Sequence, residues 1–195
     1  MTDNTHISVV GEFVYPHLTK PDVRFNEAGE YKVTLKVAKD KATEMLKSFD
    51  TAIESSVAEA EKNANGKKIK QAPKPYTIEE GNVFFKFKMK ATGTNRKTKE
   101  PFSQRPVVLD SQKNPMPSTI SIWGGTKGKI AFQLRSYYVP ALGAGVTAQL
   151  KAVQIIDLVE GGSKQLELFD KEDGYVSSEQ SENVQATEVQ ASTDF

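Results

Sequence analysis

Residues 83–110, VFFKFKMKATGTNRKTKEPFSQRPVVLD, begin with a strict alternation of side-chain character. Three apolar side chains fall on one face, namely Phe85, Phe87 and Met89. The opposite face carries Phe84, Lys86, Lys88 and Lys90. A period of two is typical of a β-strand with one buried and one solvated face. Because a polar loop (92–100) and a second apolar run (107–109) follow, the stretch predicts a β-hairpin with a long basic tip.

The predicted hairpin carries a dense positive charge. Between positions 86 and 105 it has seven basic residues and one acidic residue, Glu100. The seven are Lys86, Lys88, Lys90, Arg96, Lys97, Lys99 and Arg105. Such a field suits a phosphate backbone. The alternative is a solvated edge strand whose lysines only prevent aggregation.

The composition suits one domain with a substantial core, with part of the chain left unpacked. The chain has 195 residues, and its hydrophobic content is only 37%. It contains no cysteine, which excludes disulfides and cysteine-based metal sites. No apolar run approaches the roughly 20 residues that cross a membrane, and the N-terminus lacks the pattern of a signal peptide. We therefore expect an intracellular protein.

The net charge of +1 is the sum of two opposite regions. Residues 1–169 hold 25 Lys+Arg and 18 Asp+Glu, a net of +7, whereas residues 170–195 hold one Lys and seven acids, a net of −6. We expect a nucleic-acid-binding domain over 1–169 and a disordered acidic tail over 170–195, because the tail is too polar to bury a core. The tethered tail can compete with a polyanion for the basic body. Its end, Asp194 and Phe195, suggests a peptide that docks on a partner.

The rest of the chain predicts short strands and one helix. We expect strands over 5–14, 30–38, 119–123, 129–139 and 146–159. Residues 15–26 contain Pro16 and Pro21 and are predicted as a loop. Apolar residues at three- and four-residue spacing predict an amphipathic helix over 40–64, with Asp40 as N-cap and Gly66 as its stop.

These elements predict a mainly β fold. Glycines that punctuate the long strands favour an OB-fold-like small curled antiparallel barrel, with one amphipathic helix and the disordered acidic tail. The spacing fits another small β-barrel or a sandwich equally well.

The sequence contains no catalytic pattern. His6 and His17 are the only histidines, and there is no Walker A loop, no G-x-S-x-G elbow and no HExxH motif. The segment GGTKGK at 124–129 lacks the spacing of a phosphate loop and predicts a β-turn. We therefore expect that the protein is not an enzyme and that it uses no metal and no cofactor.

Aromatic side chains on polar faces are candidates for stacking against bases. A single strand is held by phosphate contacts and by base stacking, which contributes about 1–3 kcal/mol per base. Phe84, Trp123 and Tyr137 fall in register with polar residues, and Phe102 lies in the basic loop. Packing of these rings beneath the helix is the alternative.

Several motifs together resemble single-stranded-DNA-binding proteins of tailed bacteriophages. They are VFFKFKMK at 83–90, SIWGGTKGKI at 121–130, YYVPALGAGVTAQLKAVQIIDL at 137–158 and the acidic tail that ends in Asp-Phe. The resemblance implies an OB-fold that coats single-stranded DNA in replication and recombination, in the host cytoplasm, with a tail that contacts replication proteins. Carried over by position, the DNA surface includes Lys86, Lys88, Lys90, Arg96, Lys97, Trp123, Lys127, Lys129 and Arg135, and the partner contact is Phe195. To these candidates we add Lys99, Arg105 and Tyr137 for DNA and Asp194 for the partner.

The chain departs from this family pattern in two respects. Its tail acids are spread out rather than clustered beside the last residue. The helix follows only two strands, whereas a simple OB-fold has it after the third, which implies an elaborated barrel.

Two other classes of function stay open. A structural or interaction module would use its lysines for solubility alone and would bind no nucleic acid. An RNA-binding or annealing protein would share the basic surface, because both nucleic acids present phosphates and bases. The oligomeric state has no signature in the sequence.

Overall fold

The computed structural model describes residues 4–24, 26–95 and 97–160. The chain divides into two units, Met1–Gly161 and Gly162–Phe195, and every described residue belongs to the first. The predicted boundary at residue 169 and the predicted disorder of the tail therefore lie outside the described residues. In the described part, no helix combines the length and the apolar character that a membrane span needs.

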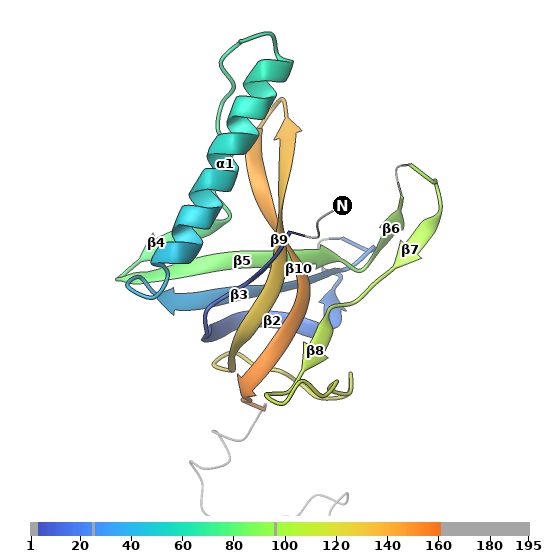
Figure 1. Cartoon of the computed structure of the whole chain (residues 1–195). Coiled ribbons are helices and arrows are strands. Elements are labelled where there is room, and N and C mark those ends of the chain that lie inside the picture. Colours follow the sequence, from blue (N-terminus) through green and yellow to red (C-terminus); the bar gives the residue numbers. More distant parts are fainter. Residues whose placement is uncertain (1–3, 25, 96, 161–195) are drawn as a thin grey trace, which may run out of the picture. The chain divides into compact units, whose positions relative to one another are not determined.

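A closed barrel is the centre of the fold (Figure 1). Its strands are β2 (Gly11–Asp22), β3 (Glu30–Ala38), β5 (Asn82–Lys90), β9 (Lys127–Val139) and β10 (Gly143–Asp157). The order around the ring is β9-β2-β3-β5-β10, and β9 pairs with β10 as well as with β2. These neighbours are antiparallel except for β5 and β10, which run parallel. The closed sheet confirms the OB-fold-like prediction, with one parallel contact that the sequence did not indicate.

Shorter strands surround the barrel. The strands β1 (Thr5–Ile7), β4 (Tyr76–Glu79) and β8 (Val107–Leu109) pair with β9, β5 and β10, respectively. The strands β6 (Thr92–Thr94) and β7 (Pro101–Ser103) pair with each other in a separate sheet. This β6–β7 ribbon projects from the barrel (Figure 1).

The predicted hairpin over residues 83–110 is wrong in its pairing. Its first strand, β5, lies between β3 and β10, and its return strand, β8, runs parallel to β10. Only the polar tip folds back on itself, as the β6–β7 ribbon. Alternation indicates which face of a strand is buried but does not identify the neighbouring strand. The predicted buried face is confirmed, since Phe85, Phe87 and Met89 are all buried.

Two further local predictions are wrong. Residues 15–22 continue β2 instead of forming a loop. Pro16 and Pro21 are tolerated in this strand because both lie at register shifts between β2 and β3, where the ladder needs no backbone N–H donor. Residues 119–123 form no strand. The last residue of this segment, Trp123, is instead held by a hydrogen bond from its N–H to the carbonyl oxygen of Val159, at 3.1 Å.

Helix α1 (Thr43–Asn63) follows β2 and β3, the first two barrel strands, as the sequence indicated. It begins after Ala42 without a side-chain cap, so the prediction of Asp40 as N-cap is wrong. Gly66 has a φ of +79°, and its N–H donates to the carbonyl oxygen of Glu61 at 2.9 Å. This geometry confirms Gly66 as the stop of the helix.

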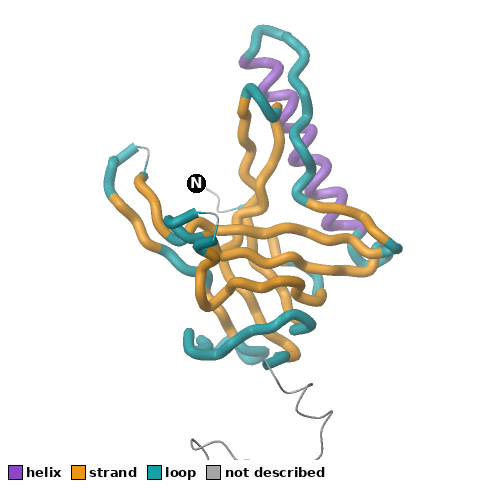
Figure 2. Tube along the Cα trace, turned by 180° about the vertical axis from the view of Figure 1, so that it is seen from behind, coloured by secondary structure: helices purple, strands orange, loops and turns teal. Residues whose placement is uncertain are grey.

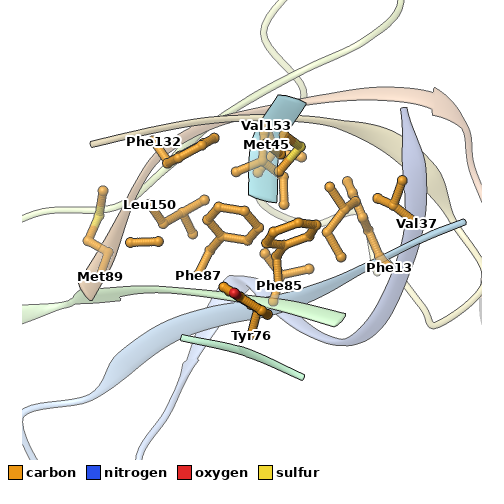
Figure 3. Packing of buried hydrophobic residues seen from close by; sticks show 14 of the residues in the cluster. Phe13, Val37, Met45, Tyr76, Phe85, Phe87, Met89, Phe132, Leu150 and Val153 are labelled. Atoms are coloured by element: carbon orange, nitrogen blue, oxygen red, sulfur yellow. The ribbon is translucent and has the colours of Figure 1, made fainter. Parts of the chain in front are cut away.

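The hydrophobic core lies between α1 and the inner face of the barrel. The ring of Phe49 on α1 lies 5.1 Å from that of Phe85 and 5.5 Å from that of Phe132, measured between centroids. Figure 3 shows Phe85 and Phe87 side by side below Met45 of α1. The helix therefore covers the core, to which it contributes Met45, Phe49 and Ile53.

A polar contact fixes the segment between α1 and β4. Lys74 Nζ lies 2.7 Å from Asp50 Oδ1, and the Tyr76 hydroxyl donates to the same oxygen at 2.6 Å. The hydrogen bond to Asp50 raises the pKa of Lys74 to about 12. The N–H of Ala72 donates to the carbonyl oxygen of Ala144, which ties this segment to the β9–β10 hairpin beside α1 (Figure 2).

Two glycines meet where the barrel closes. The strands β2 and β9 pair over two residues each, and Gly11 lies opposite Gly128. A Cβ on Gly11 would lie 2.7 Å from the carbonyl oxygen of Lys36, and a Cβ on Gly128 would overlap the carbonyl oxygen of Gln154. Because these neighbours are backbone atoms, they cannot move aside like a flexible side chain. The seam therefore requires glycine at both positions.

We expect Gly128→Ala to lower the free energy of unfolding by about 1–3 kcal/mol, because the added methyl group overpacks the seam. Thermal unfolding measures the effect, because the melting temperature of a chain of this size falls by about 2–4 °C for each kcal/mol lost. Gly124→Ala is the matched control, since a Cβ there would lie 3.8 Å from the carbonyl oxygen of Phe13, an ordinary contact. Equal melting temperatures for the two variants would show that the seam tolerates a side chain.

Candidate nucleic-acid interface

A groove of about 1110 Å³ lies over the solvent-facing side of β2, β3 and β5. The sheet register sets its floor, because Lys32 of β3 lies opposite Lys88 of β5, and Thr34 lies opposite Lys86. The turn 121–125, which holds Trp123, also lines it. We call this hollow the β2–β3–β5 groove.

Basic side chains outnumber acidic ones in the β2–β3–β5 groove. The basic lining residues are Lys20, Arg24, Lys32, Lys86 and Lys88. The acidic ones are Glu12 and Glu30. A concave surface with an excess of one charge concentrates its field, and a positive field attracts a phosphate backbone. The groove therefore has the electrostatics of a polyanion site.

Two exposed aromatic side chains line the same groove. Tyr15 is 81% exposed and Trp123 is 55% exposed. The segments that carry them are joined at Phe13, whose N–H donates to the carbonyl oxygen of Thr126 at 2.7 Å and whose carbonyl oxygen accepts from the N–H of Gly125 at 2.9 Å. Exposed rings beside a basic groove form the combination that binds single strands, since bases stack on the rings while the cations contact phosphates.

A buried carboxylate holds part of the basic lining in place. The Asp22 side chain is 4% exposed, and its Oδ2 lies 2.6 Å from Lys32 Nζ. Arg24 donates to Asp22 Oδ1 from its backbone N–H at 3.0 Å and from Nε at 3.2 Å. Hydrogen bonds first from Lys32 and then from Arg24 hold the pKa of Asp22 well below its usual range. Asp22 thus stays ionised and orients two cations of the groove.

The structure brings three of the predicted DNA-binding residues together in the groove, namely Lys86, Lys88 and Trp123. Lys90 is exposed on the same face of β5, opposite Glu30 of β3. Three more predicted residues are exposed in or beside the β6–β7 ribbon, namely Lys97, Lys99 and Arg105. Arg96, Asp194 and Phe195 lie outside the described residues.

The four predicted residues of β9 do not line the groove. Lys127 Nζ lies 3.4 Å from Asp157 Oδ2, and Arg135 donates to the Gln133 side chain at 3.1 Å. Lys129 and Tyr137 are half-buried on the same strand. Their contact with nucleic acid stays a prediction, on a part of the barrel wall that the groove does not include.

The sequence analysis missed several groove residues, namely Tyr15, His17, Lys20, Arg24 and Lys32. The four on or just after β2 were missed because residues 15–26 were predicted as a loop. Lys32 falls on the polar face of the predicted strand over 30–38 but was not assigned to a site. The signal for Lys32 was available, since β3 and β5 show the same alternation of lysines with apolar residues.

The described residues contain no group of three or more His, Cys, Asp or Glu side chains that could hold a metal ion. Comparison with known proteins instead relates the fold to a nucleic-acid-binding family. The family model "Single-stranded DNA-binding protein, Bacteriophage T7" matches residues 12–158, which is most of the chain and all of the barrel except Gly11. The chain belongs to this family.

Two relatives support this assignment. The single-stranded DNA-binding protein of Enterobacteria phage T3 is 32% identical over 191 residues, covering 85% of this chain and 82% of the relative. The protein of the same name from Escherichia phage T7 is 33% identical over 190 residues, covering 84% and 81%. The family is named for binding, which agrees with the prediction that the protein is not an enzyme.

Solved structures share the fold. The crystal structure of gp2.5, a single-stranded DNA-binding protein encoded by bacteriophage T7, matches with a TM-score of 0.72 and 29% identity, covering 89% of this chain and 98% of that chain. The single-stranded DNA-binding protein of bacteriophage Enc34, in complex with single-stranded DNA, matches with a TM-score of 0.58 and 20% identity, covering 82% and 89%. The second likeness is one of fold alone.

We expect Asp22→Asn to be less stable than the wild type at neutral pH, because Lys32 and Arg24 lose their buried counter-charge. Since the folded pKa of Asp22 lies below its unfolded value, this stabilisation is present above about pH 4 and is lost as the pH falls through the folded pKa. Urea unfolding between about pH 7 and about pH 2 should therefore show the gap between wild type and variant constant at first and narrowing below about pH 4. The exposed Asp40→Asn is the control; a gap that stayed constant with pH would contradict this role of Asp22.

Proposed function

We propose that the protein binds single-stranded DNA, with little sequence preference, in the β2–β3–β5 groove. The observation that carries the proposal is the groove itself, which places basic side chains and two exposed aromatic rings on one concave surface in a chain of this family. Phosphates would contact Lys86, Lys88 and their neighbours, and unpaired bases would stack on Trp123.

The chemistry of the groove favours single strands of any sequence. Lysine side chains recognise phosphates, which every nucleotide has, and an aromatic ring stacks on any base. In a duplex the bases are stacked on each other, so their faces are not available to Trp123. The same features support a role in phage DNA replication and recombination, where single strands are exposed in the cytoplasm of the host.

We further propose that the tail, residues 170–195, regulates access to the groove and recruits partners. Its net charge of −6 is opposite to that of the basic body, so it can occupy the groove when DNA is absent. Binding of DNA would then release the tail, and Asp194 and Phe195 would contact replication proteins. In this arrangement residues 1–169 act as the DNA-binding domain.

We expect the double variant Lys86→Glu/Lys88→Glu to bind a labelled oligo-dT at least about tenfold more weakly than the wild type, since two phosphate contacts become repulsive. Fluorescence anisotropy between about 50 and 200 mM salt gives the slope of log K against log salt. If the wild type neutralises five phosphates, its slope is about −3.5, and the loss of two contacts makes the slope of the double variant shallower by about 1.4.

The control is Lys41→Glu/Lys47→Glu, the same change of charge at exposed positions beside and on α1. Equal loss in both double variants would mean that net charge, and not the groove, governs binding. Displacement of oligo-dT by duplex or by oligo-U at equal concentration would contradict the preference for single-stranded DNA. An absence of binding at low salt, also without the tail, would leave a structural module whose lysines serve solubility.

Removal of residues 170–195 should tighten binding of oligo-dT at low salt, because it removes the intramolecular competitor. The gain should shrink as salt rises, since screening weakens the attraction between tail and groove. A full-length variant whose seven tail acids are replaced by the corresponding amides is the matched control, because it keeps the length and removes the charge. Unchanged or weaker binding after truncation would contradict competition by the tail.

A further inference from the structure

Tyr15 interrupts the regular alternation of β2. Phe13 and Leu18 are both buried, although residues five apart in a regular strand face opposite sides of the sheet. The register between β2 and β3 shifts between Val14 and His17, which is where an extra residue must be accommodated. Tyr15 lies in this bulge with a φ of +49°.

The bulge changes where the Tyr15 side chain points. In a regular strand Tyr15 would share a face with Phe13, which is fully buried in the core. The shift instead leaves Tyr15 81% exposed among the residues that line the β2–β3–β5 groove. Bulges in barrels commonly re-aim a side chain in this way next to a functional site.

The backbone of Tyr15 gives a second, independent indication. A positive φ is an outlier for a bulky residue and is found where the surroundings enforce it, often at ligand sites. Glycine adopts this φ without strain, so the turn in the chain does not need an aromatic side chain. Nor does packing need it, because the ring is exposed. A ligand that contacts the face of the ring would explain why an aromatic residue occupies this position.

We infer that Tyr15 is a base-stacking residue, presented by the β2 bulge, and that it forms a nucleobase site together with Trp123 on the same groove. The inference rests on the proposed function and goes beyond it, because it assigns base stacking to a residue of the β2 bulge that the sequence analysis did not single out. Phosphates on either side of the stacked base meet the groove lysines, of which Lys32 and Lys86 lie on the adjacent strands. The site takes any base, since the ring offers a face and the contact uses no base edge.

The test measures affinity of the full-length protein for oligo-dT by fluorescence anisotropy at low salt. Tyr15→Leu, which keeps bulk but loses the flat ring, should weaken binding about 5- to 150-fold, the range expected for one stacked base. Tyr15→Phe should bind oligo-dT nearly as tightly as the wild type, because it keeps the ring. Tyr138→Leu is the matched control, since Tyr138 is also exposed, at 51%, but does not line the groove.

A second measurement separates stacking from an effect on folding. An oligonucleotide of the same length that carries abasic sites keeps its phosphates but offers no bases. The wild type should bind it more weakly than oligo-dT, and Tyr15→Leu should discriminate less between the two. Tyr15→Gly should bind as weakly as Tyr15→Leu and melt at a higher temperature, because glycine relieves the strained φ.

The outcomes distinguish this inference from the proposed function. A wild type that fails to bind oligo-dT contradicts the proposed function itself. Salt-sensitive binding that Tyr15→Leu leaves unchanged overturns only the role of Tyr15. Weaker binding by Tyr15→Leu with undiminished discrimination against abasic sites also overturns it, since the ring would then act on something other than a base.

Discussion

The close approach of the β2 and β9 backbones at Gly11 and Gly128 is the constraint on which the rest of the structure depends. It closes the strands into a ring and so separates an aromatic interior from a basic exterior. It also brings the turn 121–125 against β2, where hydrogen bonds on both sides of Phe13 hold it. The wall of the groove that carries Trp123 is therefore a product of barrel closure, and a change at the seam would alter stability and the site together.

Several cations lie close together in the groove, and nearby carboxylates offset part of their mutual repulsion. Asp22 is buried between Lys32 and Arg24, and Lys88 lies 3.9 Å from Glu30, so part of the positive charge is balanced and held in place. Within the described residues, Lys86 makes no ion pair. The balanced cations give the surface a fixed geometry, while an unpaired lysine on a flexible stem can follow a phosphate wherever the strand places it.

Much of the fold was predictable from side-chain periodicity, because apolar and polar residues alternate within β3 and within β5 and so mark the buried and the solvated face of each strand. What alternation lacks is the identity of the neighbour, and so the pairing of β5 with β10, about 60 residues apart, was missed, as was the parallel β8. For the same reason Lys86 and Arg135 were both predicted to contact DNA but could not be assigned to different parts of the barrel wall. The β2 bulge was hidden because Pro16 and Pro21 suggest a loop, and only the register with β3 reveals a strand.

The two ends of the main sheet, β1 and β8, are each only three residues long. The β8 edge is further occupied by a bridge from Leu109 to Pro115. A long free edge would recruit a strand from a neighbouring copy wherever many copies lie close together. Edges this short offer few backbone groups for such pairing, so these two ends of the sheet protect the barrel against edge-to-edge aggregation.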